Sequence, residues 1–97
     1  MRFQIEFTQS AEKDTEYFTK YEQRIIITGI RRFLSEDANV ETKRKKQLRP
    51  NKLAPWELKI GNFRVFYGIE KRNLAKIIAV GVKEHDELFV RGKRVEL

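Results

Sequence analysis

A two-residue turn between two β-prone runs is the feature that most limits how this chain can fold. Gly61-Asn62 separates Trp56–Ile60 from Phe63–Tyr67, and such a dipeptide between apolar runs predicts a β-hairpin. The short loop sets the pairing register, which places Lys59 opposite Arg64. Since side chains alternate in direction along a strand, the hairpin has two different faces. The apolar face, which we expect to pack on the rest of the chain, carries Trp56, Leu58, Ile60, Phe63, Val65 and Tyr67.

The opposite face of the predicted hairpin carries Glu57, Lys59, Arg64 and Phe66. We expect this face of the sheet to be open, with two cations and a carboxylate side by side. The alternation therefore divides the hairpin into a packing side and a charged side that faces solvent.

Two helices are predicted before the hairpin. Residues 2–7 alternate with period two and should form a first strand, followed by a helix that is capped at Thr8 or Ser10 and ends near Thr19. A second helix should span about residues 20–35, where apolar side chains recur at helical spacing. Gly29 lies inside this pattern, and we expect it to mark close packing between the two helices.

A central strand is predicted over residues 74–83, because apolar side chains occur on both of its faces. Ile78, Val80 and Val82 should lie on one side. Ile77, Ala79, Gly81 and Lys83 should lie on the other, where the small residues would leave room for a ligand beside Lys83. Residues 88–91 could add a short last strand. The predicted fold is α+β, with two N-terminal helices packed on a four- or five-stranded, mostly antiparallel sheet, in a single domain spanning residues 1–97.

The formal net charge of +7 is concentrated in one half of the sequence. Residues 1–42 contain six basic and eight acidic residues, whereas residues 43–97 contain fifteen and six. This asymmetry suggests that the C-terminal half faces a polyanion, with a solubilising surface as the plainer alternative. The long connection over residues 40–54 predicts a phosphate-binding arm for RNA, with a solvated loop or an extra helical turn over residues 41–46 as the alternatives. Its six cations are Lys43, Arg44, Lys45, Lys46, Arg49 and Lys52.

The composition also excludes several kinds of site. Cysteine is absent and His85 is the only histidine, which excludes disulfides, cysteine nucleophiles and multi-histidine metal sites. The first residues lack the long apolar core of a signal peptide, and no apolar run is long enough to cross a bilayer. We therefore expect a soluble cytoplasmic protein with no membrane partner.

The hairpin and the strand after it resemble a known family. Residues 56–60 followed by Gly-Asn-Phe-Arg-Val-Phe-Tyr at 61–67 resemble the central hairpin of the RelE/ParE toxin superfamily, and Ile-Ile-Ala-Val-Gly-Val-Lys at 77–83 resembles its next strand. The resemblance covers nearly the whole chain and implies the fold predicted above. It also implies the toxin of a type II toxin–antitoxin module. Its partner would be a cognate antitoxin, and any DNA binding would occur only through the antitoxin complex.

For a nuclease of this superfamily, the resemblance implies ribosome-dependent cleavage of messenger RNA. The ribose 2′-hydroxyl attacks its own 3′ phosphate, with no metal or cofactor. Arg64 matches the family's arginine, which can hold a phosphate through two hydrogen bonds. Lys59 matches a lysine across from that arginine, and Lys83 matches a basic position after a glycine. His85 lies near a histidine that acts as general acid in some members. Lys59 could equally be a solvated strand cation, and a lone histidine among acidic neighbours is more often solvated surface.

Two positions depart from the nuclease pattern. Glu57 stands where a second lysine is preferred, and it could be a general base or pair with a neighbouring cation. Phe89 stands where several nucleases carry a tyrosine, and a phenylalanine can stack on a base but cannot transfer a proton. Phe66 could stack on a nucleobase or pack in the core. The leading interpretation is a messenger-RNA endonuclease, and the alternatives are a ParE-like DNA gyrase inhibitor without catalytic activity or an inactive antitoxin-binding member.

Overall fold

The computed structural model describes residues 1–97 and contains two helices and seven strands. In chain order they are β1 (Gln4–Phe7), α1 (Gln9–Glu16), α2 (Lys20–Leu34), β2 (Lys45–Gln47), β3 (Trp56–Ile60), β4 (Phe63–Glu70), β5 (Leu74–Glu84), β6 (Glu87–Val90) and β7 (Lys93–Val95). The α+β class and the two N-terminal helices are as predicted. The predicted count of four or five strands is wrong, because β2 and β7 have only three residues each and carry no clear alternation.

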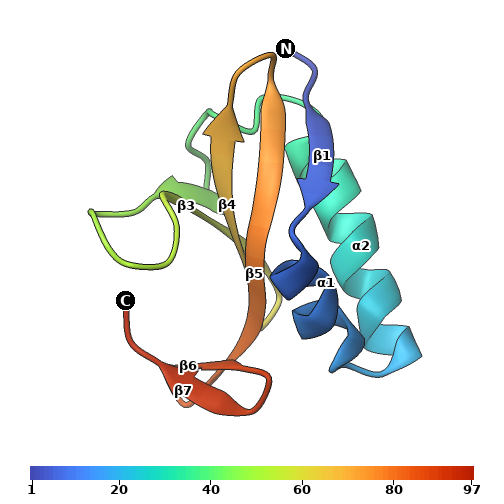
Figure 1. The fold of residues 1–97 in the computed structure, drawn as a ribbon, viewed down its shortest axis with the longest axis vertical. Coiled ribbons are helices and arrows are strands. Elements are labelled where there is room, and N and C mark those ends of the chain that lie inside the picture. The colour runs from blue at the N-terminus through green and yellow to red at the C-terminus, as the bar shows by residue number, and fades with distance from the viewer.

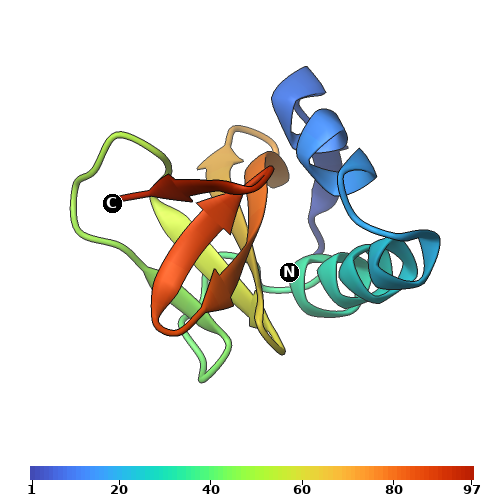
Figure 2. The same cartoon turned by 90° about the horizontal axis from the view of Figure 1, so that it is seen from below.

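All seven strands belong to one sheet, with the order β2-β3-β4-β5-β6-β7 and with β1 parallel to the first part of β5. Both helices lie on one face of this sheet (Figure 1). Seen from below, the sheet curls, and β7 leads from the β6–β7 turn to the C-terminus on the side away from the helices (Figure 2). Neither helix has the length and apolar character needed to cross a membrane.

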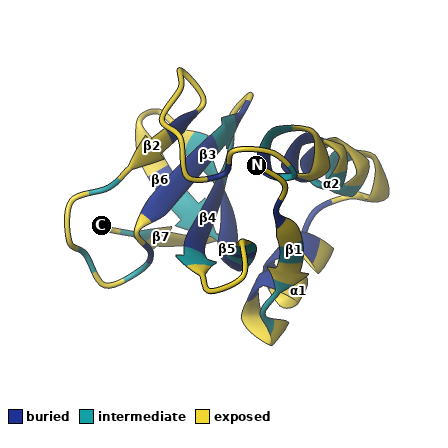
Figure 3. Cartoon of the chain, turned by 90° about the horizontal axis from the view of Figure 1, so that it is seen from above, coloured by how far each residue is buried: buried dark blue, intermediate teal, exposed yellow.

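The β3–β4 hairpin has the register that its turn predicts. Lys59 is paired with Arg64 and Trp56 with Tyr67, and the two rings of the latter pair are stacked with centroids 5.9 Å apart. The predicted apolar face packs against the helices in the main core, together with Ile26, Ile30 and Leu34 of α2. Figure 3 shows this burial in the central strands, in contrast to the exposed outer side of α2.

The opposite face of the sheet is partly covered, so the expectation of an open face is wrong. Phe66 is fully buried there in a second, smaller cluster with Ala54, Ala79 and Leu88. Leu48 and Leu53 of the long connection pack against this cluster, as do Val90 and Val95 of the last two strands. The curl of the sheet brings these segments over β4, which pattern analysis of single strands does not reveal.

A β-bulge shifts the register of β5 against β4. Phe66 pairs with Ala79 but Tyr67 pairs with Ile77, so Ile78 is left out of the ladder. An extra residue of this kind reverses the direction of the side chains that follow it. Ile77 therefore lies in the main core with Val80, whereas Ile78 packs against the second cluster. The predicted division of Ile77 and Ile78 between the two faces is wrong for this reason.

Each helix begins at a threonine. The Thr8 hydroxyl accepts a hydrogen bond from the Ala11 N–H at 3.0 Å, and Thr19 forms a capping box with Glu22. Because Thr19 starts α2, α1 ends at Glu16, short of the predicted end near Thr19. Gly29 packs on the sheet rather than on α1, since a methyl group at this position would lie 2.5 Å from the Ile60 side chain. The expected helix–helix contact at Gly29 is thus a helix–sheet contact.

Helix α1 supplies hydrogen bonds to a part of β5 that lacks a neighbouring strand on one side. β1 pairs with residues 74–77 and β6 with residues 82–84, which leaves the edge between them open. The Thr8 hydroxyl donates to the Ile78 carbonyl at 3.3 Å, and the Asp14 carboxylate accepts from the Val80 N–H at 3.0 Å. Asp14 is fully buried, and its other oxygen lies 2.8 Å from Nε of Arg91. The helix thereby closes the gap and holds the β6–β7 turn.

Tyr67 makes the stability of the fold sensitive to alkaline pH. Its buried hydroxyl donates to the Ala38 carbonyl at 2.8 Å, and burial raises the pKa of Tyr67. An unfolded tyrosine ionises at about pH 10, so this contribution to stability is intact below that pH and is lost as the pH rises above it. Ionisation of Tyr67 is followed as the difference in absorbance at 295 nm between the unaltered chain and Tyr67→Phe. For the native proteins this difference should therefore appear at higher pH than it does for the same proteins in denaturant. Equal titration midpoints in the two states would contradict this prediction.

Candidate functional site

Three cations lie on the sheet face opposite the helices, and we call Lys59, Arg64 and Lys83 the cationic face. Lys59 pairs with Arg64 across β3 and β4, and Arg64 pairs with Gly81 across β4 and β5. Lys83 follows Gly81 by two residues in the same strand and so points to the same side. All three side chains are half-buried. The predicted phosphate-binding set is therefore brought together on neighbouring strands.

The Arg64 guanidinium is folded back onto the hairpin turn. Its Nη1 donates to the carbonyls of Gly61 at 2.8 Å and Phe63 at 3.0 Å, while its buried Nε has no hydrogen-bond partner. An unpartnered buried donor is unfavourable, typically by about 1–3 kcal/mol. Rotation toward an anion would release Nε, and water could replace the guanidinium at the carbonyl of exposed Gly61. This arginine can therefore change partners at low cost.

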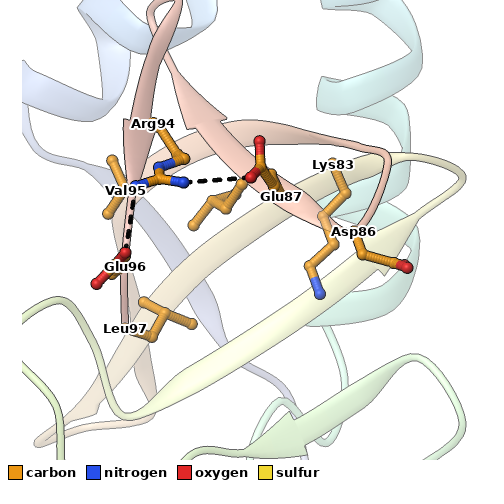
Figure 4. Close-up of a pocket in the computed structure, with 8 residues that line it drawn as sticks. Lys83, Asp86, Glu87, Arg94, Val95, Glu96 and Leu97 are labelled. Atoms are coloured by element: carbon orange, nitrogen blue, oxygen red, sulfur yellow. Dashed lines mark hydrogen bonds and ion pairs between the residues drawn. The ribbon is translucent and has the colours of Figure 1, made fainter.

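Lys83 lies beside a hollow of about 330 Å³ that is formed by the β5–β6 turn and the C-terminal tail. Figure 4 shows Lys83 and Asp86 on one side of the hollow and Val95 to Leu97 on the other. Arg94 is held there by Glu87 at 3.2 Å and Glu96 at 3.4 Å, whereas Lys83 has no ion-pair partner. Lys83 is thus the free cation of this hollow.

The space above Gly81 is occupied, so the predicted room for a ligand at that residue is absent. A methyl group on Gly81 would lie 2.5 Å from the Phe89 carbonyl oxygen and 3.0 Å from the Val90 side chain. Glycine is needed here because β6 approaches the backbone of β5 closely. A ligand near Lys83 would have to enter from the hollow by the C-terminal tail.

His85 is exposed at the tip of the β5–β6 turn. Both His85 and Asp86 have positive φ angles, 52° and 67°, which form a two-residue turn that pairs Glu84 with Glu87. The histidine follows Lys83 by two residues, but its side chain forms no hydrogen bond or ion pair with the cationic face. Its predicted role as general acid stays a prediction.

Glu57 and Phe66 face the same side as Arg64 but are buried. Glu57 is 4% exposed and Phe66 is fully buried. Phe66 is therefore core, and it is not available to stack on a nucleobase. Glu57 lies opposite Lys46 in register, yet no cation comes within 4 Å of its carboxylate. The expected ion pair with a neighbour does not form, and its role as general base stays a prediction.

Phe89 lies on the opposite side of the sheet from the cationic face. It pairs with Val82 and lines a hollow with Tyr17 and Phe18 beside the helices. Phe89 therefore cannot stack on a base held at the cationic face, and its predicted contact with RNA stays a prediction. The cause is the two-residue turn at His85, which sets the direction of every side chain in β6.

Five of the six cations in the long connection are exposed, namely Lys43, Arg44, Lys46, Arg49 and Lys52. Lys45 is the exception, because it belongs to β2 and its side chain points to the helix side of the sheet. Its Nζ donates to the Asp37 carbonyl at 2.8 Å, and burial lowers the pKa of Lys45. Lys45 is thus a structural residue and leaves the predicted RNA-binding set.

Two features near these residues are not apparent from the sequence patterns. Strand β2 was assigned to a long loop, although Lys45 and Lys46 alternate between the two sides of the sheet as strand residues do. Phe33 of α2 lies under the guanidinium of Arg44, with 4.6 Å between the ring centroid and Cζ. No short sequence motif signals this contact, because the two residues come from different elements.

Comparison with known proteins identifies the fold. No protein-family model and no curated protein matches the sequence. Among solved structures, a chain of the toxin–antitoxin complex RelBE2 from Mycobacterium tuberculosis is similar, with a TM-score of 0.73 and 18% identity over 86% of this chain and 100% of that chain. A chain of the archaeal RelE–RelB complex from Pyrococcus horikoshii OT3 is also similar, with a TM-score of 0.67 and 17% identity over 88% and 99%. The protein therefore has the fold found in RelE toxin–antitoxin complexes, as its resemblance to the RelE/ParE superfamily predicts.

Proposed function

We propose that this protein is the toxin of a toxin–antitoxin module and that it cleaves messenger RNA on the ribosome. The observation that supports this most strongly is the cationic face, where Lys59, Arg64 and Lys83 lie on the same side of three neighbouring strands. Three cations on one sheet face match the needs of a reaction in which a phosphate gains negative charge in its transition state. The fold is consistent with this function but does not distinguish it from others in the superfamily.

In the proposed reaction, Arg64 leaves the hairpin carbonyls and holds the scissile phosphate together with Lys59 and Lys83. Glu57 takes the proton of the ribose 2′-hydroxyl, and the 2′ oxygen then bonds to phosphorus. The bond from phosphorus to the 5′ oxygen breaks, and His85 donates a proton to that oxygen. The products are a 2′,3′-cyclic phosphate and a 5′-hydroxyl end, so atoms and charge balance without a metal or cofactor.

The proposed partner is an antitoxin that neutralises the cationic face with an acidic segment. Arg49 and Lys52 are exposed on the long connection, whose Leu48 and Leu53 pack on the same side of the sheet as the cationic face. A chain that opposes these charges would block the route of RNA to Arg64. The structural neighbours come from the toxin–antitoxin complex RelBE2 and from an archaeal RelE–RelB complex, which supports the proposal of a cognate antitoxin.

A second candidate function is inhibition of DNA gyrase without catalysis. It is favoured by the burial of Glu57 and by the position of Phe89 away from the cationic face. Both weaken the catalytic set that a nuclease needs. A gyrase inhibitor would use the same fold for binding and would cut no RNA.

The two candidates are separated by mapping new 5′-hydroxyl RNA ends soon after the chain is expressed from a tight promoter. A ribosome-dependent nuclease should produce ends at fixed codon positions inside translated frames. A matched reporter transcript that lacks its start codon should stay intact, because no ribosome reaches it. Growth arrest with a DNA-damage response and without new ends would reject the nuclease and support the gyrase inhibitor.

A further inference from the structure

Two arginines from different parts of the chain stack on one phenylalanine at the edge of the sheet. The guanidinium carbon of Arg44 lies 4.6 Å from the centroid of the Phe33 ring, and that of Arg32 lies 5.3 Å from it. Arg32 and Phe33 are in α2, whereas Arg44 immediately precedes β2. We call Arg32, Phe33 and Arg44 the arginine–phenylalanine stack. Neither guanidinium is engaged in an ion pair with the chain, so their N–H groups are free to bind a ligand.

The stack borders a hollow of about 510 Å³ whose free charge is positive. The hollow is lined by Arg32, Phe33, Glu36, Asp37, Val40, Thr42, Lys43, Arg44 and Lys45. Of its two acids, Asp37 is paired with the N-terminal ammonium at 2.7 Å, which lowers the pKa of Asp37. Glu36 alone then opposes Arg32, Lys43 and Arg44. An anion entering this hollow meets a surplus of cations.

We propose that the arginine–phenylalanine stack is a second phosphate-binding site for single-stranded RNA, separate from the cationic face. A guanidinium that lies on an aromatic ring uses its flat face for the contact and keeps its N–H edge free. That edge can donate two parallel hydrogen bonds to a phosphate. The ring also limits the motion of both side chains, so less conformational entropy is lost when they bind.

The position of Arg44 connects this site with the cationic face. The Lys59 N–H donates to the Arg44 carbonyl at 2.8 Å, so Arg44 continues the β2–β3 ladder by one residue beyond β2. A strand of RNA that leaves Lys59 would pass around this edge of the sheet to reach the Arg44 side chain, which lies against Phe33 of α2. The choice of RNA as the ligand rests on the proposed function. An acidic protein segment is the competing ligand, and polyglutamate is its probe in the binding experiment.

The test measures binding of a fluorescent oligouridylate of about 12 nucleotides, a length within the usual range for single-strand sites. The oligonucleotide is 2′-O-methylated so that it cannot be cleaved. Each phosphate contact contributes about 0.7 to the slope of log K against log salt concentration for single strands. Arg32→Ala and Arg44→Ala should therefore each lower the magnitude of the slope by about 0.7, and the double variant by about 1.4.

Arg31→Ala is the matched control, because it removes the same charge from the neighbouring residue of α2. Arg31 is exposed and lines a different hollow, with Lys20 and Arg24. The slope of log K against log salt concentration for Arg31→Ala should equal that of the unaltered chain. Phe33→Leu keeps every charge and should still weaken binding several-fold, because the guanidinium planes lose their support. If Arg31→Ala and Arg32→Ala weaken binding equally, the attraction is diffuse and the proposed site is wrong.

The outcomes also separate this site from the proposed nuclease. If expression gives no 5′-hydroxyl ends but oligonucleotide binding depends on Arg32 and Arg44, the nuclease proposal fails and the second site stands. If transcripts are cut and the double variant binds the oligonucleotide normally, the second site fails alone. Loss of polyglutamate binding in the double variant, with RNA binding intact, would assign the stack to an acidic protein and overturn the proposal.

Discussion

Replacing Asp14 with alanine is expected to lower the free energy of unfolding by about 2–3 kcal/mol. Asp14 is 1% exposed, and its carboxylate is the acceptor for the Val80 N–H at 3.0 Å. Neither β1 nor β6 reaches Val80, so this donor would be buried without a partner. A loss of this size is a large fraction of the stability of a small domain. Urea denaturation followed by circular dichroism measures it.

Three further variants isolate the cause. Asp14→Asn keeps an oxygen for the Val80 N–H and should cost less than alanine. Arg91→Ala removes the 2.8 Å ion pair, but its side chain is 46% exposed, so solvent screening limits the loss to about 1 kcal/mol. Glu16→Ala removes an exposed acid from the same helix and should change stability by less than about 0.5 kcal/mol. Equal costs for Asp14→Ala and Glu16→Ala would show that α1 does not close the gap beside β5.

The parts of the fold that were predictable from the sequence are those set by local chemistry. The Gly61-Asn62 turn determines the register of β3 with β4, and with it the position of Lys59 opposite Arg64. Capping by Thr8 and the apolar spacing of α2 are local in the same sense. A short-range pattern of this kind needs no knowledge of the rest of the chain.

The parts that were not predictable depend on contacts between distant residues. The burial of Phe66 requires Leu48, Leu53 and Leu88 to fold over β4, and these come from both sides of it in the sequence. The bulge at Ile78 reverses the alternation of β5, which no count of apolar residues reveals. The errors in the predicted fold therefore come from the curl of the sheet and from the bulge in β5.

The candidate site shows the same division. Arg64 and Lys59 were placed correctly because a two-residue loop joins their strands. The side of the sheet on which Phe89 lies was not predictable, because His85-Asp86 is an unusual dipeptide for a turn with two positive φ angles. Had that turn been recognised, the pairing of Phe89 with Val82 would have followed from it.

Arg64→Ala is expected to reduce messenger-RNA cleavage about 100- to 1,000-fold, which is the usual loss when one stabilising donor of a transition-state charge is removed. Its guanidinium is the one group on the cationic face that can hold two phosphate oxygens at once. Arg64→Lys keeps the charge but not this geometry, so it should recover only part of the rate. Single-turnover cleavage of a transcript on programmed ribosomes, with toxin in excess, measures the chemical step.

The structure indicates that these variants should fold normally, which makes their activities interpretable. Arg64 bonds only to the carbonyls of Gly61 and Phe63 within its own hairpin, and its Nε has no partner to lose. The unfolding midpoint of Arg64→Ala should therefore stay within a few degrees of the unaltered chain. Arg24→Ala, an exposed cation of α2 with the same charge change, should cleave at the normal rate. If Arg64→Ala cleaves at the same rate as Arg24→Ala, Arg64 has no part in catalysis. The proposed reaction must then be abandoned, because no other side chain of the cationic face can make the same paired contact with phosphate.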